Sequence, residues 1–388
     1  MARLKADVSP VAVTTVFVAA CAMLVACSDS SSPGGPGVDP VAHDGATYVP
    51  ADEWRTAQLE QVGIDASRIN SLTQRIQSNA VPGLSSLVIV REGYLVFERY
   101  FNGSSRSDVH TMQSVSKSVT SLIAGIAADQ GKLDVAASIF DVLPTYQDLT
   151  LADPRKRNVT LRQLLEMRSG INFYESPYTG SPLERLNNSR DDWVRIALEA
   201  PMNANPGELW QYNSGGVIVI AAAVRRLTGV PFHEYARTQL FSRIGVSSAL
   251  WYVSAYDSLA HAGGGLNLRA LDLARIGYLV LRNGRWGNDQ IVSEPWLRAS
   301  LTPVTAGVAN YGGHRTDYGR LWWMFAIDAN GSTSNRAETI YAGIGNLNQW
   351  LFVVPRYDLV VVVTGQSNAS SPASFFFSDI LPAVRASF

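Results

Sequence analysis

The chain has 388 residues, of which 46% are apolar, and this is enough apolar material for a large buried core. Charged residues make up only 17%, the formal net charge is −1 and no basic block occurs, which argues against nucleic-acid binding. Lysine is scarce: the four lysines are Lys5, Lys117, Lys132 and Lys156, so none follows position 156.

The N-terminal segment, 1–27, has the pattern of a targeting signal. Arg3 and Lys5 precede an apolar run over 11–26, which is short for a membrane span and the right length for a signal-peptide core. The run ends in Leu-Val-Ala-Cys at 24–27, which resembles the bacterial lipobox, where the cysteine is lipidated and becomes the mature N-terminus. An ordinary secretory signal with an incidental cysteine is the alternative. We expect an exported lipoprotein anchored through Cys27 on the periplasmic face of a membrane, the outer membrane being one candidate.

Residues 28–45 are rich in Ser, Pro and Gly and are predicted to form a linker between the lipid and the folded part. The domain is predicted to span 46–388. Its first helix is expected at 66–78, capped by Asp65. Two apolar runs at 85–90 and 94–101, separated by a short turn with Gly93, predict a β-hairpin.

A helix is predicted directly after this hairpin, at 114–130, because its apolar residues recur at helical spacing. Thr160 and Gln163 predict a capping box for a helix at 161–167, which Gly170 is expected to close. Further helices are predicted at 191–199, 215–227, 232–240, 270–282 and 294–301.

The C-terminal part returns to strands, at 321–327, 350–354 and 359–364, and a final helix is predicted at 375–386. Strands at both ends of the chain with helices between them predict an α/β (α+β) fold. Its antiparallel sheet combines N- and C-terminal strands and is flanked by helices, and a mainly helical lobe is inserted at about 135–310.

The first candidate for chemistry is Ser114-Val-Ser-Lys117, at the predicted start of a helix. A spacing of three places the hydroxyl and the amine on one helical face, and a nucleophilic hydroxyl needs a base within reach. The helix N-terminus favours a developing oxyanion, and a buried lysine loses its proton more easily than one in water. The alternative is a surface serine and lysine on an amphipathic helix.

Two further motifs are candidates for the same site. Tyr212 precedes Asn213 and a small-residue helix start, from which its phenol can relay a proton, although a structural tyrosine is the alternative. Gly343-Ile-Gly345-Asn346 precedes a predicted strand, and its glycines allow close approach of the backbone to a ligand. A simple turn at a strand edge is the alternative there.

In this order and spacing, the three motifs resemble the penicillin-recognising serine hydrolases. That superfamily includes class C β-lactamases, family VIII esterases, D-Ala-D-Ala peptidases and hydrolases of linear amides such as 6-aminohexanoate dimers. The resemblance covers about 60–385. It implies a β-lactamase/transpeptidase-like fold in which Ser114 is acylated and Lys117 and Tyr212 move its proton. It also implies an oxyanion hole formed by the amides of Ser114 and Asn346, with Gly343, Gly345 and Asn213 beside the substrate.

The chain departs from the β-lactamase pattern at two places. The order Tyr212-Asn213-Ser214 replaces the usual Tyr-Ser-Asn or Tyr-Ala-Asn, and Gly343 replaces the lysine of a Lys-Thr-Gly triplet. Losing a charge-assisted contact with the β-lactam carboxylate costs about 1.5–3 kcal/mol. We therefore expect a small ester or amide substrate. β-Lactamase or D-Ala-D-Ala peptidase activity, or a non-catalytic peptidoglycan-binding lipoprotein, are the alternatives.

Other hydrolase types fit the sequence poorly. No Gly-x-Ser-x-Gly elbow is present, and the five histidines are scattered. Clustered zinc ligands are also missing, so we expect neither a metal nor another cofactor. The expected partners are a small-molecule substrate and, through the lipidated N-terminus, a membrane. Trp210, Trp322, Trp323 and Trp350 are candidates for an apolar acyl pocket, with core packing as the alternative.

Overall fold

The computed structural model describes residue 41, residues 47–328 and residues 332–385. The predicted signal peptide with Cys27, and all of the predicted linker except residue 41, lie outside the described residues. The described residues belong to one compact unit that spans 39–388.

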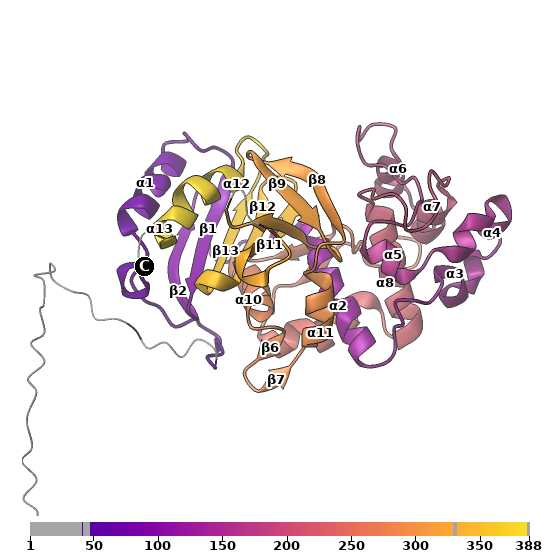
Figure 1. The fold of residues 1–388 in the computed structure, drawn as a ribbon, viewed down its shortest axis with the longest axis horizontal. Coiled ribbons are helices and arrows are strands. Elements are labelled where there is room, and N and C mark those ends of the chain that lie inside the picture. The colour runs from indigo at the N-terminus through magenta and orange to yellow at the C-terminus, as the bar shows by residue number, and fades with distance from the viewer. Residues whose placement is uncertain (1–40, 42–46, 329–331, 386–388) are drawn as a thin grey trace, which may run out of the picture. The chain divides into compact units, whose positions relative to one another are not determined.

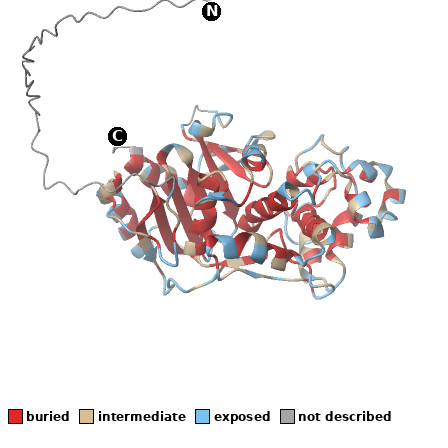
Figure 2. Ribbon diagram, turned by 90° about the horizontal axis from the view of Figure 1, so that it is seen from below, coloured by how far each residue is buried: buried red, intermediate tan, exposed pale blue. Residues whose placement is uncertain are grey.

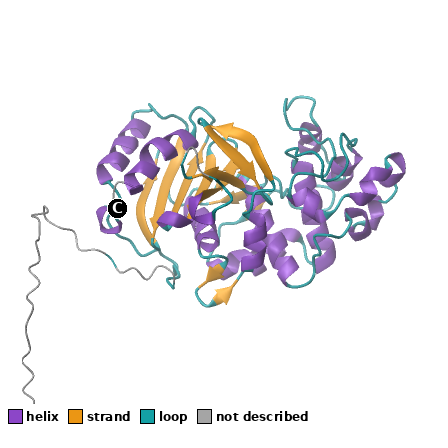
Figure 3. Ribbon diagram, viewed as in Figure 1, coloured by secondary structure: helices purple, strands orange, loops and turns teal. Residues whose placement is uncertain are grey.

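An eight-stranded antiparallel sheet is the centre of this unit (Figures 1 and 3). Its strands are β1 (Leu84–Arg91), β2 (Tyr94–Tyr100), β8 (Thr305–Tyr311), β9 (His314–Tyr318), β10 (Trp323–Ala326), β11 (Thr339–Gly345), β12 (Gln349–Val354) and β13 (Leu359–Gly365). Their order is β2-β1-β13-β12-β11-β10-β9-β8, so the N-terminal hairpin pairs with the last strand of the chain. The predicted sheet built from both chain ends is confirmed.

Helices cover both faces of the sheet, which explains the near-continuous burial of its central strands (Figure 2). On one face, α10 (Ala270–Leu281) packs closely: a Cβ on Gly277 would lie 2.6 Å from Val360 and 2.7 Å from Leu351. On the other face, Phe352 stacks on Phe376 with ring centroids 4.0 Å apart. Leu351 and Phe352 are neighbours in β12 and therefore point to opposite faces.

Phe376 lies in a π-helical turn between α12 (Pro372–Phe375) and α13 (Leu381–Arg385). These elements pack beside α1 (Ala66–Gln77), whose N-terminus is capped by Asp65 as predicted. Figure 1 shows α1, α12 and α13 together on this side of the sheet.

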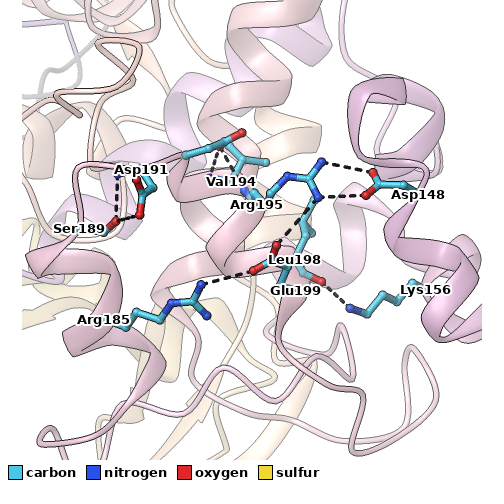
Figure 4. Close-up of polar contacts among 10 residues, drawn as sticks. Asp148, Lys156, Arg185, Ser189, Asp191, Val194, Arg195, Leu198 and Glu199 are labelled. Carbon is cyan, nitrogen blue, oxygen red and sulfur yellow. Dashed lines mark hydrogen bonds and ion pairs between the residues drawn. The ribbon is translucent and has the colours of Figure 1, made fainter.

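The chain between β2 and β8 is mostly helical. Its other helices are α2 (Val115–Asp129), α3 (Ile139–Val142), α4 (Leu149–Ala152), α5 (Leu161–Leu165), α6 (Pro182–Asn188), α7 (Trp193–Glu199), α8 (Ser214–Thr228), α9 (Phe232–Ala236) and α11 (Glu294–Ser300). The buried helix α8 packs against α2, α5 and α7. Surface ion pairs join the outer helices: Arg195 contacts Asp148 at 3.0 Å, and Arg185 contacts Glu199 at 3.4 Å (Figure 4).

Two small sheets also occur in this part of the chain. The three-stranded sheet has the order β3 (His110–Thr111), β5 (Leu266–Leu268) and β4 (Leu250–Trp251). The two-stranded sheet pairs β6 (Arg285–Trp286) with β7 (Asp289–Gln290). Pairing of β3 with β5 brings the segment after residue 260 beside the start of α2.

One local prediction was wrong and one strand was missed. The helix that begins at the Thr160–Gln163 capping box ends at Leu165, and the left-handed residue that follows it is Met167, not Gly170. The capping box itself is present. The motif Gly343-Ile-Gly345 precedes a strand as predicted, because β12 begins at Gln349, but it also forms the last three residues of β11, a strand that was not predicted.

No single helix among the described residues is long and apolar enough to cross a membrane. Helix α8 and the segment Phe232–Ile244 together have the necessary length and hydropathy, but the pair is bent by 78°.

Candidate active site

Ser114 lies at the N-cap of α2, directly after the short strand β3 and two connecting residues. The residue before it, Gln113, has φ of +48°, so the chain turns sharply into the helix. This turn exposes the Ser114 hydroxyl at the start of the helix, where unpaired amides and the helix dipole favour negative charge. Lys117, one turn further on, donates a hydrogen bond from Nζ to Ser114 Oγ at 2.9 Å.

The Lys117 amine is held in a dry environment. Its side chain is 1% exposed, and Nζ donates a second hydrogen bond, at 2.6 Å, to the backbone carbonyl of Gly263. Burial lowers the pKa of Lys117 to about 8, although the nearby Glu175 carboxylate partly opposes this shift. Lys117 therefore has an appreciable neutral fraction near neutral pH, and the neutral amine can accept the Ser114 proton over the same 2.9 Å.

Tyr212 completes a three-residue cluster with Ser114 and Lys117. Its phenol lies close enough to the Ser114 side chain to influence the pKa of Tyr212, and Lys117 Nζ lies 4.6 Å from the centre of its ring. Burial raises the pKa of Tyr212 well above its usual value, and the charge of Glu175 adds to this effect. The phenol thus keeps its proton, which suits a relay rather than a phenolate base.

The two glycines of the motif, Gly343 and Gly345, lie in different environments. Gly343 packs against α2, since its Cβ would lie 3.2 Å from Val115 and 3.3 Å from Ser118, and it does not line the cleft. At Gly345 a Cβ would lie 2.5 Å from the Met112 carbonyl oxygen and 3.0 Å from the Ser114 amide nitrogen. The end of β11 therefore lies directly against the turn that carries Ser114.

Asn346 follows this contact and lines the cleft. Its amide comes next after the glycine that touches the Ser114 backbone, so both proposed oxyanion donors belong to adjacent pieces of main chain.

The structure places Asn213, an expected substrate ligand, outside the lining of the cleft. Asn213 is the N-cap of α8: its Oδ1 accepts from the Gly216 amide at 2.8 Å, and its side chain is 4% exposed. The next residue, Ser214, is also buried, and its amide donates to Glu175 Oε1. Neither Asn213 nor Ser214 lines the cleft. The reversed order of these two residues thus gives a helix cap where we expected a substrate ligand.

Two groups at the site were missed by sequence reasoning. The acceptor for Lys117 is the backbone carbonyl of Gly263, and no sequence motif identifies a backbone carbonyl as an acceptor. Glu175 lies in the loop between α5 and α6, far from every recognised motif, and no local pattern distinguishes it from other loop carboxylates.

Ser114 opens onto a cleft of about 880 Å³. Tyr178, Tyr212, Tyr311, Trp323 and Trp350 supply its aromatic walls. Of the four candidate tryptophans, Trp323 and Trp350 line the cleft. Trp322 is fully buried, and Trp210 packs behind Tyr212 with ring centroids 6.2 Å apart.

Most of the remaining lining is polar but almost uncharged. Its amide and hydroxyl side chains include Asn187, Asn346, Asn348, Asn368, Ser176, Ser370 and Ser371. Glu175 is the one charged residue among the described residues that line the cleft. The described part of the chain holds no group of three or more His, Cys, Asp or Glu residues placed to bind a metal.

Comparison with known proteins gives consistent matches. The model of the family described as Beta-lactamase matches residues 69–376. The 6-aminohexanoate-dimer hydrolase of Paenarthrobacter ureafaciens is 25% identical over 314 residues, which are 76% of this chain and 75% of that protein. Esterase EstB of Burkholderia gladioli is 28% identical over 161 residues, 37% of this chain and 41% of the esterase.

Solved structures share the fold. A Bacillus anthracis protein, provisionally named a 6-aminohexanoate-dimer hydrolase, superposes with a TM-score of 0.69 at 23% identity, and the match covers 88% of this chain and 90% of that one.

Proposed function

Because the chain belongs to the beta-lactamase family and is a serine hydrolase, we propose that it cleaves a small ester or amide through an acyl-enzyme on Ser114. The observation that carries this proposal is the contact of 2.9 Å between Ser114 Oγ and the buried amine of Lys117, at the edge of a cleft. A hydroxyl that lies next to a desolvated amine is an activated nucleophile, because the neutral amine can accept its proton.

In the proposed reaction, neutral Lys117 takes the Ser114 proton while Oγ bonds to the substrate carbonyl carbon. The carbonyl oxygen becomes an oxyanion, which the amides of Ser114 and Asn346 stabilise. The bond to the leaving group then breaks, and Tyr212 passes a proton to that group and recovers one from Lys117. Water then attacks the acyl carbon, and its proton passes through Tyr212 to Lys117 and from there to Ser114 Oγ, the reverse of the first route. This step releases the acid and restores Ser114.

A neutral ester or amide fits this cleft better than a β-lactam. The position of the β-lactamase lysine is taken by Gly343, and none of the described residues that line the cleft carries a positive charge. A β-lactam carboxylate would lack its usual partner, at a cost of about 1.5–3 kcal/mol. The names of the relatives, an amide-dimer hydrolase and an esterase, support the same substrate class.

We also propose that the enzyme works outside the cytoplasm as a lipoprotein. The support is the sequence at 1–27, in which a positive start and a short apolar run end at Cys27.

The nucleophile is tested by labelling with a fluorophosphonate probe, together with turnover of p-nitrophenyl hexanoate, hexanoyl p-nitroanilide and nitrocefin. We expect labelling and turnover in the wild type, with ester or amide turnover exceeding that of nitrocefin. Ser114→Ala and Lys117→Ala should lose both signals.

Two matched variants serve as controls for this test. Ser121→Ala changes another serine of α2, one that faces Ser300, and Lys132→Ala changes an exposed lysine just beyond that helix. Both should label like the wild type. Labelling that survives Ser114→Ala would remove the assignment of the nucleophile, and no labelling in any variant would favour a non-catalytic binding protein.

A further inference from the structure

Glu175 is placed to contact substrate although the reaction proposed above does not use it. It is half-buried, it lies in the loop before α6, and it lines the cleft that contains Ser114. Its charge raises the pKa of both Lys117 and Tyr212, which places the carboxylate within electrostatic range of the reacting groups.

Only part of this carboxylate is used by the fold. Oε1 accepts a hydrogen bond from the Ser214 amide at the start of α8, where the helix dipole also favours a negative charge. Oε2 accepts no hydrogen bond from any residue that the structure describes. The cap of α8 is supplied separately by Asn213, so capping alone does not account for a charged residue at 175.

The surroundings of Oε2 favour a cation. No arginine, lysine or histidine occurs among the described residues that line the cleft, so no side chain there competes for the carboxylate. Lys117 is 1% exposed, and its amine donates hydrogen bonds to Ser114 and Gly263. Aromatic faces such as those of Tyr178 and Trp350 in the same cleft also attract cations.

From this arrangement we propose that the enzyme prefers ester or amide substrates that carry a protonated amine, which pairs with Glu175, and that it discriminates against substrates that carry a carboxylate. The inference rests on the proposed hydrolase function and adds a substrate class to it. A charge-assisted pair of this kind corresponds to roughly a ten- to hundredfold preference.

The test compares three p-nitrophenyl esters of equal chain length: hexanoate, 6-aminohexanoate and the monoester of adipate. Rates of the full-length protein are corrected for uncatalysed hydrolysis, and kcat/KM is measured for each ester. In the wild type we expect the amino ester to exceed hexanoate by about tenfold or more and the adipate ester to fall below hexanoate.

Glu175→Gln should bring the three values to within about threefold of one another. Glutamine keeps an oxygen that can accept from the Ser214 amide, so the start of α8 is preserved. The change also alters the pKa of Lys117, but that effect is common to the three esters and cancels in their ratios. Glu184→Gln is the matched control, because Glu184 bonds the Gly180 amide nearby and does not line the cleft.

The outcomes separate the two proposals. Absence of turnover of all three esters in the wild type contradicts the hydrolase function itself. Hexanoate turnover without a preference for the amine, or a preference that survives Glu175→Gln, contradicts the role of Glu175 alone. Loss of the preference in Glu184→Gln as well would show a general effect of negative charge and would also overturn the proposal.

Discussion

At the scale of single residues, the site depends on how one lysine is buried. The spacing of Ser114 and Lys117 predicted that their side chains share a helical face, and the structure places the two groups 2.9 Å apart. The sequence left open whether Lys117 would be buried or exposed, and it did not indicate that the carbonyl of Gly263 would hold the amine. Burial depends on the loop at 263–265 and on Tyr212, which are distant in sequence, so spacing alone cannot predict the pKa.

Burial of Lys117 leads to a prediction on pH. Because Lys117 must be neutral to accept the Ser114 proton, kcat/KM for a neutral ester should rise with pH through an ionisation near 8. The negative charge of Glu175 stabilises the protonated amine, so Glu175→Gln should move this rise to lower pH. A profile of p-nitrophenyl hexanoate turnover from pH 5.5 to 10 measures both effects. A flat profile, or a rise displaced to higher pH in Glu175→Gln, would contradict the role of Lys117 as base.

At the scale of elements, the end of β11 meets the start of α2. The glycine motif was recognised, but β11 was not predicted, because Thr339–Gly345 ends in glycines that strand patterns disfavour. In the structure these glycines let the strand approach the helix, so a tertiary contact outweighs local propensity. Asn213 is a second case in which local sequence did not predict the contact. Its side chain caps the first turn of α8, and comparison of motifs does not reveal that role.

This contact between elements is tested by Gly345→Ala. The added Cβ would lie 2.5 Å from the Met112 carbonyl oxygen, which is backbone and cannot rotate away. The strand end must then shift from Ser114, and the Asn346 amide moves with it. We expect kcat for p-nitrophenyl hexanoate to fall by roughly a hundredfold. A fall of this size is typical when one donor of an oxyanion hole is lost or misplaced.

Gly343→Ala is the comparison for that variant. Its Cβ would meet the Val115 and Ser118 side chains at 3.2 and 3.3 Å, and small side-chain adjustments can absorb such contacts. We expect a fall of less than tenfold, with thermal unfolding monitored for both variants so that lost activity is not mistaken for lost folding. Equal losses in the two variants would show that the effect comes from packing of β11 and not from the oxyanion hole.

At the scale of the whole molecule, the site depends on long-range pairing. Ser114, Tyr212, Gly263 and Gly345 come from four distant parts of the chain, and the sheet that joins β1 to β13 brings the two ends of the described unit together. Strands at both ends of the chain, with helices between them, predicted that architecture. The sequence did not indicate which loop would border the cleft. Loop positions depend on tertiary packing, and the local sequence carries little information about them. Glu175, like the carbonyl of Gly263, was therefore identified only by the structure.

The proposed lipid anchor at Cys27 is also a property of the whole molecule. It determines where the enzyme is located, whereas the catalytic cluster determines its activity. If Cys27 is lipidated, the full-length chain expressed in a bacterial host should incorporate labelled palmitate and sediment with membranes, and its esterase activity should follow it. Cys27→Ser should lose the label and leave the membrane fraction. Cys21→Ser, which changes the only other cysteine of the chain, should behave like the wild type.

Since the catalytic cluster lies in the unit at 39–388, the soluble Cys27→Ser protein should retain its kcat for p-nitrophenyl hexanoate. Palmitate that persists in Cys27→Ser would contradict the lipobox. A wild-type chain that is exported without label would instead support an ordinary secretory signal with an incidental cysteine.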